Sequence, residues 1–377
     1  MNQMSQVPPV PRPTGVAFSG DRGEFRRLVT RGALLELITV GFYRFWLATD
    51  MRRHLWSRTS VDGDSAEYTG TGKELLIGFL VALAIIVPIY VLYFVLSLEA
   101  ERLRAFASFP LLAFFYVFGQ FAIFRARRYR LTRTVWRGVR FWMDGSGWAY
   151  AARATLWALL VGVTFGLVLP WREAALERYK MGHSYYGNLQ GRFEGRGGEF
   201  FKRGWGLWLL APIALVIFPL FPFVYAMFKA IEMRWWLSGI RFGGVRFESS
   251  LPRGAYTGLY WKVIGWAALL SLGMVIYLSL CAFAMRSLGG ASPDEMFAGA
   301  NLAASIPLLV LAVLGYLGFV LANGVVFRVY LMRDLWARVA TSITVHNIAA
   351  AANVKAEGQL ASALGEGLAD GLDVGGF

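Results

Sequence analysis

One acidic residue, Glu36, lies within an apolar stretch, three positions before the segment Thr39-Val40-Gly41. An ionisable side chain at membrane depth is a candidate functional residue, because an unpaired charge there is costly. A carboxylate in this position could bind a cation or carry a proton. The alternative, which we favour, is a structural role in which Glu36 pairs with Arg31 or Arg44 or reaches the cytoplasmic interface.

Uncharged polar residues within apolar stretches extend this candidate intramembrane site. They are Thr39, Thr164, Gln120 and Asn323. Hydrogen bonding between helices, worth about 0.6–2 kcal/mol for each residue, is the structural alternative for Thr164, Gln120 and Asn323.

The densest basic run of the chain follows directly after an apolar stretch. Clusters of four to eight basic residues on the cytoplasmic side of a membrane span bind anionic lipids, and the planar guanidinium group suits phosphate. The run therefore predicts binding of anionic phospholipids, with charge that only sets the topology as the alternative. Its residues are Arg125, Arg127, Arg128, Arg130, Arg133 and Arg137, with Arg140 beyond them.

Motifs typical of enzymes and metal sites do not occur. The three histidines, His54, His183 and His346, fall in separate segments, and the single Cys281 excludes paired-cysteine spacing. The segment Gly70–Glu74 is similar to the end of a phosphate-binding loop. However, Glu67 occupies the position of the first glycine of that motif, and Glu74 replaces its Ser or Thr. No G-x-S-x-G motif is present. We therefore expect no enzyme activity, no metal and no cofactor.

The composition is that of a membrane protein. The chain has 377 residues, of which 56% are hydrophobic and only 16% are charged, whereas soluble domains carry about 25% charged residues. A membrane-spanning helix needs about 20 apolar residues. Four stretches meet this requirement: Leu75–Leu98, Phe106–Phe124, Val263–Met285 and Leu302–Phe327.

The charge distribution predicts an orientation. The segments between the members of each pair of spans, residues 99–105 and 286–301, hold three of the 38 basic residues. The positive-inside rule places these two segments outside and the other basic segments in the cytoplasm. We therefore expect a multi-pass protein of the bacterial inner membrane with both termini cytoplasmic. Nucleic acid is not an expected partner, because the membrane already accounts for the net charge of +14.

Three further apolar stretches are irregular, and each has basic segments on both sides. Glycine or proline interrupts each stretch near its middle, and such residues break helices. We predict re-entrant hairpins that enter from the cytoplasm and turn back, with seven ordinary spans as the alternative. The stretches are Ala33–Trp46, Ala154–Trp171 and Gly204–Phe228, with breaks at Thr39-Val40-Gly41, at Thr164-Phe165-Gly166 and at Pro212, Pro219 and Pro222.

The sequence also repeats itself. The pattern F-x-G-x-x-G-E-F occurs at Phe18–Phe25 and Phe193–Phe200, each time before an irregular stretch and a pair of spans. Residues 18–147 and 193–347 therefore form two parallel repeats, and residues 148–192 add an extra re-entrant element. Short glycine-centred segments after the helices predict small cytoplasmic β-hairpins, with interfacial loops as the alternative.

The predicted fold class is an all-α polytopic membrane protein built from these two repeats. Residues 1–17 are expected to be a disordered N-terminal tail. Residues 348–377 are expected to be a flexible, acidic tail rich in Ala and Gly, with a short partner-binding helix as the alternative.

The order of these motifs resembles that of the YjgN-like family of bacterial inner-membrane proteins of unknown function. The opening Phe18–Phe25, the helix motif Thr39–Trp46 and the segments Trp136–Phe141 and Arg241–Phe247 carry the resemblance. The opening is one position shorter than the family pattern, and the third irregular stretch is proline-rich instead of carrying T-L-G. The resemblance implies no activity and no catalytic residues.

Two classes of function remain open. The first is a transporter, channel or lipid-handling protein that uses the broken helices, because parallel repeats with broken helices resemble transporter construction. The second is a non-catalytic scaffold or regulator of a partner membrane protein. The expected partners are the lipid bilayer and anionic phospholipids, and the second class adds a partner membrane protein.

Overall fold

The computed structural model describes residues 13–99, 104–287 and 302–362. The chain divides into two compact units, and each is described by itself. Unit 1 contains the chain up to Gly20, residues Arg44–Tyr256, and the chain from Ala337 onwards. Unit 2 contains Asp21–Tyr43 and Thr257–Trp336.

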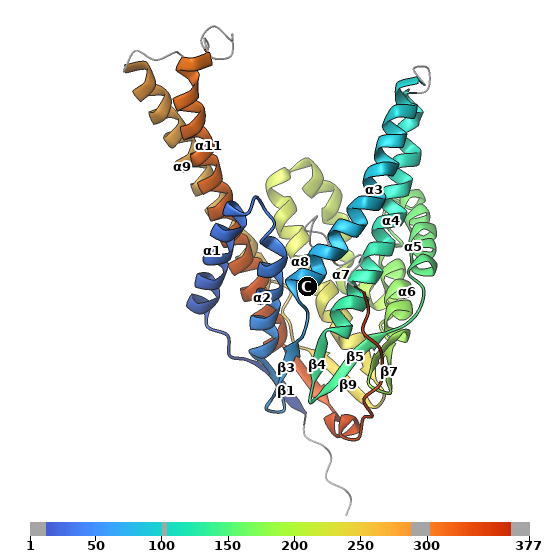
Figure 1. Ribbon diagram of the computed structural model, residues 1–377. Helices are drawn as coiled ribbons and strands as arrows, with labels where there is room; N and C mark the ends of the chain where they lie inside the picture. The colour runs from blue at the N-terminus through green and yellow to red at the C-terminus, as the bar shows by residue number, and fades with distance from the viewer. Residues whose placement is uncertain (1–12, 100–103, 288–301, 363–377) are drawn as a thin grey trace, which may run out of the picture. The chain divides into compact units, whose positions relative to one another are not determined.

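Unit 1 is built on a closed antiparallel barrel of ten short strands, several of which are labelled in Figure 1. Strands that follow each other in the chain are neighbours in the barrel, and β10 pairs with β1 to close it. The strands are β1 (Thr14–Phe18), β2 (Thr59–Val61), β3 (Asp64–Tyr68), β4 (Thr134–Trp136), β5 (Val139–Met143), β6 (Ser184–Tyr186), β7 (Leu189–Phe193), β8 (Ile240–Phe242), β9 (Val245–Ser249) and β10 (Ile343–His346).

Two-residue turns connect the strands at one end of the barrel. Asp62-Gly63 and Arg137-Gly138 both have positive φ at each residue, which is the conformation that tight antiparallel hairpins require. Gly187 and Gly243 supply the positive φ of the other two turns. The glycine-centred segments of the sequence are thus hairpin turns.

Aromatic side chains fill the inside of the barrel. Phe141 on β5 packs against Tyr186 on the adjacent strand β6, with ring centroids 4.7 Å apart. Phe141 also contacts Phe242 on β8, which is not a neighbour of β5, at 5.9 Å. A contact between strands that are not paired shows that these rings point into the barrel.

The barrel corrects the predicted fold class. The sequence predicts an all-α protein with separate β-hairpins, whereas the hairpins join into one closed sheet. A separate two-stranded hairpin has two unpaired edges and is marginally stable in water, and closure removes the edges. The last residues of the expected N-terminal tail belong to this barrel as β1, and residues 1–12 lie outside the described part.

The helices are inserted between paired strands. The chain leaves the barrel after β5 and returns as β6, and Met143 at the exit pairs with Ser184 at the return. The same holds at Phe193 and Ile240, around the next pair of helices. Because antiparallel strands alternate in direction, all of these connections leave from one barrel end. In unit 1 the helices are α2 (Arg44–Ser57), α3 (Gly72–Glu99), α4 (Arg104–Thr132), α5 (Gly147–Val163), α6 (Leu169–Gly182), α7 (Gly197–Val216) and α8 (Phe221–Gly239).

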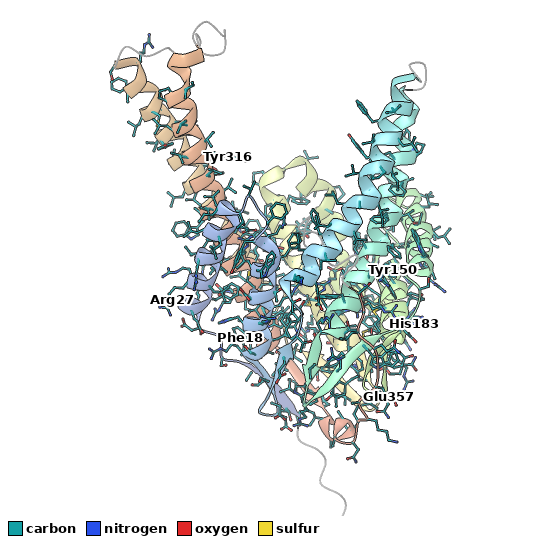
Figure 2. All side chains as sticks on the ribbon, in the orientation of Figure 1. Phe18, Arg27, Tyr150, His183, Tyr316 and Glu357 are labelled. Carbon is teal, nitrogen blue, oxygen red and sulfur yellow. The ribbon has the colours of Figure 1, made fainter. Side chains whose placement is uncertain are left out.

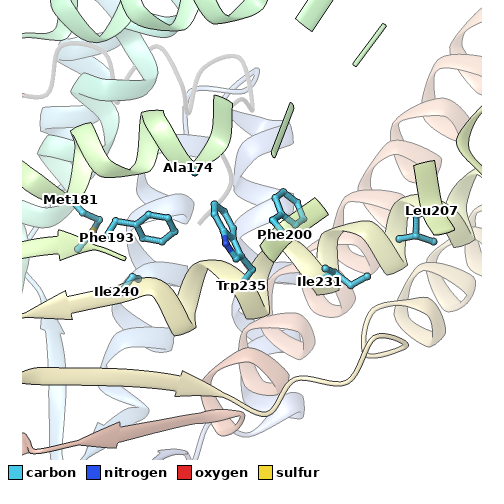
Figure 3. Packing of buried hydrophobic residues seen from close by; sticks show 8 residues of the cluster. All are labelled: Ala174, Met181, Phe193, Phe200, Leu207, Ile231, Trp235 and Ile240. Carbon is cyan, nitrogen blue, oxygen red and sulfur yellow. The ribbon is translucent and has the colours of Figure 1, made fainter. Parts of the chain in front are cut away.

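An apolar core joins helices α6, α7 and α8 to strands β7 and β8 (Figure 3). The Trp235 ring lies at its centre. It stacks on Phe200 with centroids 4.8 Å apart and meets the Phe193 ring edge-on at 5.0 Å. This packing fixes the α7–α8 hairpin on the barrel.

The described elements of unit 2 are all helices. They are α1 (Arg22–Ile38), α9 (Thr257–Ser287), α11 (Leu302–Phe327) and η3, a π-helical segment (Arg328–Asp334). Helix α12 (Leu335–Thr341) then leads the chain back to β10.

Among the residues that the structure describes, four helices are long and apolar enough to cross a membrane. They cover Gly72–Val95, Phe109–Thr132, Thr257–Ala284 and Val310–Thr341. This confirms the four spans predicted from the sequence at the level of length and composition.

Two of the three predicted breaks, at Thr39 and Thr164, are helix ends, and the third lies later than its first proline, because α7 continues through Pro212. Helix α1 ends at Ile38, α5 ends at Val163 and α7 ends at Val216. A short 3-10 turn, Phe218–Leu220, follows α7. The next helix begins a few residues later in every case.

Candidate functional site

Glu36, the first of the predicted site residues, forms an ion pair within unit 2. The Arg328 Nη2 atom lies 2.8 Å from Glu36 Oε2 and 3.0 Å from Oε1. Only 18% of the Glu36 side chain and 20% of the Arg328 side chain are exposed. The partner is therefore neither Arg31 nor Arg44 but a residue 292 positions along the chain.

Arg328 is the first residue of the π-helical segment η3, and Glu36 lies on α1. A second ion pair joins the last residue of η3 to α1. Arg22 Nη2 at the start of α1 lies 3.1 Å from Asp334 Oδ2. The Arg22 guanidinium also lies over the Tyr330 ring, 4.6 Å from its centroid. Since π-helical turns are rare and are frequent at functional sites, η3, which is anchored at both ends, is a second feature of interest in unit 2.

Thr39 closes the end of α1. Its Oγ1 donates to the Leu35 carbonyl at 2.7 Å and accepts from the Tyr43 N–H at 2.9 Å. The Gly41 N–H bonds to the Glu36 carbonyl at 2.7 Å, which is the long bond of a Schellman cap. Thr39 therefore satisfies the backbone of a broken helix.

Thr164 does the same at the end of α5. Its Oγ1 donates to the Leu160 carbonyl at 2.7 Å. The Gly166 N–H reaches back to the Val161 carbonyl at 2.8 Å. Backbone at membrane depth needs such internal partners, so these two caps suit a chain that turns within a bilayer.

The residues at the tips of these caps are strained and exposed. Val40 has φ 52° and Phe165 has φ 50°, in the left-handed region where glycine is usual. Their side chains are 87% and 97% exposed, and Val216 beside the third break is 85% exposed. All three breaks thus present an uncovered apolar residue.

The five predicted intramembrane residues are divided between the two units. Glu36, Thr39 and Asn323 lie in unit 2, whereas Thr164 and Gln120 lie in unit 1. Asn323 donates to the Phe319 carbonyl of its own helix at 2.9 Å. Gln120 is half-buried on α4. Thus Thr39 and Thr164 cap helices, Glu36 forms an ion pair, and Asn323 bonds within its own helix.

The basic run is also dispersed. Arg127 pairs with Glu177 at 2.9 Å and Arg133 pairs with Glu74 at 2.7 Å. Arg137 binds Asp62 and Asp64 in the turns of the barrel. These three arginines therefore form ion pairs with carboxylates of the same chain. Arg125 and Arg128 are not in ion pairs within the described residues, and Arg130 lies nearby on the same helix.

A buried ion cluster between α4 and α6 was missed by the sequence reasoning. Glu177 is buried and accepts from Arg127, and Lys180 also pairs with it. Burial opposes ionisation of Glu177, but Arg127 and Lys180 outweigh it and lower its pKa to about 2. The signal in the sequence was the spacing of Glu173 and Glu177, which places both carboxylates on one face of a helix.

Two more ion pairs lie beside this cluster. Glu173 pairs with its neighbour Arg172, and Lys229 Nζ on α8 lies 2.7 Å from Glu232 Oε2. Burial raises the pKa of Glu173, opposed by Arg172, and the nearby Glu232 raises it further. The helices above the barrel therefore contain a layer of charges that are matched within the protein.

Metal binding has no support in the part of the chain that the structure describes. No group of three or more His, Cys, Asp or Glu side chains is placed there to hold an ion. His183 and Asp144 form a pair of two such side chains, with His183 Nδ1 2.7 Å from Asp144 Oδ1.

One family of known proteins matches the chain. The family is described as "Bacterial protein of unknown function (DUF898)", and it matches residues 13–212 and again residues 203–371. The double match agrees with an internal repeat. No curated protein matches the chain, and no solved structure matches it.

Proposed function

The chain belongs to the DUF898 family of bacterial proteins of unknown function, and we propose that it is a multi-pass inner-membrane protein that handles lipids through short helical hairpins. The proposal assigns no catalytic residue, metal or cofactor to the chain. Four candidate spans are present in the described residues. The proposal adds to them an orientation in the membrane and a mode of action.

The orientation follows from charge and topology together. The lightly charged segments 99–105 and 286–301 face the periplasm under the positive-inside rule. All helical connections leave one end of the barrel. We therefore place the barrel, both termini and the basic segments in the cytoplasm.

The α5–α6 hairpin is the observation that carries the proposal. Its two ends are held by paired strands, Met143 opposite Ser184. The helices have 17 and 14 residues, or about 25 and 21 Å at 1.5 Å per residue, whereas the hydrocarbon core is about 30 Å thick. A hairpin that is too short to cross and is fixed at both ends on the barrel enters the membrane and turns back.

The tip of the hairpin supports insertion. The Phe165 side chain is 97% exposed, and burying a phenylalanine side chain in an apolar environment contributes about 1.5–3 kcal/mol. The turn leaves few polar backbone groups unpaired, because Thr164 and Gly166 close the helix end. The tip is therefore apolar in both side chain and backbone.

Lipid handling follows from insertion into one leaflet. Hairpins that end within the bilayer occupy area in the cytoplasmic leaflet only, and elements shorter than the bilayer thin it locally. Local thinning of the bilayer eases the passage of a polar headgroup between the leaflets.

The experiment is lipid exchange in vesicles that contain the purified protein. A fluorescent phospholipid is placed in both leaflets, and an impermeant reductant is added outside. The proposal predicts that the inner-leaflet signal is also lost, and that Phe165→Asn slows this loss while Phe165→Leu does not. Intact vesicles are verified with an entrapped dye.

Other outcomes would select other functions. Flux of ions or protons without lipid exchange would contradict the proposal and support a transporter or channel. Neither lipid exchange nor flux, in vesicles that hold correctly inserted protein, would support the scaffold instead.

A further inference from the structure

The chain after β10 runs along unit 1 as an extended segment, residues 353–362, which we call the C-terminal strap. The Lys355 N–H donates to Asn188 Oδ1 at 3.1 Å, and the Lys355 carbonyl accepts from the Asn188 N–H at 3.1 Å. The strap is thereby anchored at the turn between β6 and β7. Figure 2 shows Glu357 of the strap at the barrel end of the molecule.

The strap then follows the outside of the barrel towards α4. Gly358 lies against the Trp142 ring, with φ +101° and so little space that a Cβ would come within 2.2 Å of the ring. Farther along, the Ala361 N–H donates to Thr132 Oγ1 at 3.4 Å. The path ends where Ser362 Oγ accepts from Arg125 Nη2 at 2.6 Å.

Arg125 and its neighbour Arg128 differ from the other arginines of the basic run. They are three positions apart on α4 and so share a face of that helix. The Nε atoms of both are buried, and neither has a hydrogen-bond partner in the described residues. Arg127, in contrast, is paired with Glu177. Two adjacent cations with unused donors favour binding of an anion.

The position on α4 selects the kind of anion. Arg125 is the first charged residue after the apolar stretch Phe106–Phe124. A side chain at that point lies at the level of the lipid headgroups when α4 spans the membrane. Guanidinium groups bind phosphate oxygens with two parallel hydrogen bonds. Anionic headgroups of the cytoplasmic leaflet present phosphate there.

We infer that Arg125 and Arg128 bind the phosphodiester of an anionic phospholipid, and that the C-terminal strap covers this site when no lipid is bound. Ser362 Oγ then occupies the position of a phosphate oxygen. The strap is held by a few hydrogen bonds, by close packing at Gly187 and Trp142, and by the buried side chain of Ala361, and it detaches without unfolding the barrel. The inference rests on the proposed function only in requiring that α4 crosses the membrane.

The test counts lipids retained by the full-length protein. The protein is placed in nanodiscs of phosphatidylcholine with a small fraction of phosphatidylglycerol, and bound lipids are counted by native mass spectrometry. Gly358→Val opens the strap, because a branched side chain fits neither the φ of +101° nor the space beside Trp142. Faster amide hydrogen exchange over residues 353–362 verifies the opening, and a chain ending at Ala352 replaces the variant if the strap stays closed.

Retention of phosphatidylglycerol should rise in the opened protein. Arg125→Gln with Arg128→Gln should lower retention about thirtyfold, as expected for two arginine–phosphate contacts at about 1 kcal/mol each, whether the strap is open or closed. Arg153→Gln, at an exposed arginine of α5, is the matched control and should change nothing. Added inorganic phosphate should not displace the lipid.

Each part of the inference has its own contradicting result. An opened strap with unchanged retention would overturn the covering role. Unchanged retention in the double arginine variant would overturn the site, and displacement by inorganic phosphate would assign the site to free phosphate. Protease protection of α4 in the same nanodiscs reports insertion, so failure of the inference is separate from failure of the proposed function.

Discussion

The Glu36 carboxylate and the Arg328 guanidinium lie 2.8 Å apart and join the end of a broken helix to the start of a π-helical segment. Both groups are about four-fifths buried. A carboxylate bonded to arginine is already neutralised, which leaves little for a transported cation to bind. The pair is therefore a structural link within unit 2.

We predict that Glu36→Gln lowers thermal stability in detergent by about 3 kcal/mol or less, because it leaves a buried arginine without its countercharge. Adding Arg328→Gln should restore most of the loss. Thermal unfolding followed by circular dichroism measures both variants. Rescue by Arg44→Gln instead of Arg328→Gln would show that the pair is not formed.

A second prediction concerns the strained hairpin tip. Phe165→Asn should raise stability in detergent by about 1 kcal/mol, because asparagine tolerates the left-handed region better than phenylalanine. The same substitution should weaken membrane insertion, because the apolar side chain is lost. Thermal unfolding measures the first effect, and fluorescence quenching by bromolipids of a probe beside the tip measures the second.

Opposite signs in the two measurements are the distinctive result. A loss of stability in detergent would mean that Phe165 packs against the protein. Unchanged quenching would mean that the tip is not in the bilayer.

The local features of the fold could be predicted from the sequence. The breaks at Thr39-Val40-Gly41 and Thr164-Phe165-Gly166 were identified because glycine and the preceding threonine end helices in a recognisable way. The four spans were identified from length and apolarity alone. These features depend on residues within a few turns of each other.

The long-range features could not be predicted. Closure of the barrel requires Thr14 to pair with Val345, and no local pattern specifies which hairpin edges meet. Glu36 was expected to pair with an arginine on its own stretch, but its partner is 292 positions away. Glu177 was overlooked because the residues after Trp171 were considered only as a basic flank of an apolar stretch, and its partner Arg127 is 50 positions away.

The two carboxylates of α6 should respond to pH with opposite signs. Burial raises the pKa of Glu177, but the charges of Arg127 and Lys180 outweigh burial and hold this pKa at about 2, below the ordinary value of 4.5. Its ionised form therefore stabilises the fold above pH 4.5, and this stabilisation is lost as the pH falls towards 2. Glu177→Gln should destabilise the protein at pH 7 by about 3–5 kcal/mol, and less at pH 3.

Glu173 is the matched control on the same helix. Burial raises its pKa above 4.5, so its protonated form favours folding at low pH, and this advantage is lost as the pH rises through the raised pKa. Glu173→Gln should therefore raise stability at pH 7 and have no effect below pH 4.5. Thermal unfolding between pH 3 and pH 8 checks both variants. Equal responses of the two variants would contradict this assignment of the charges.

The central claim is that the α5–α6 hairpin enters the membrane from the cytoplasm and turns back. Thiol accessibility in intact cells tests it most directly, with single cysteines at Ser146, Phe165 and Gln190 in a Cys281→Ala background. Ser146 precedes α5 and Gln190 follows α6, so the two positions report the two flanks of the hairpin. Cysteines at Leu103 and Ser292 are the expected periplasmic controls.

The account predicts that an impermeant reagent labels positions 103 and 292 from outside, and labels positions 146 and 190 only after the cells are opened. Position 165 should stay protected from the aqueous reagent on both sides. Labelling of position 146 or position 190 from outside, with the other flank protected, would show a full span and contradict the account.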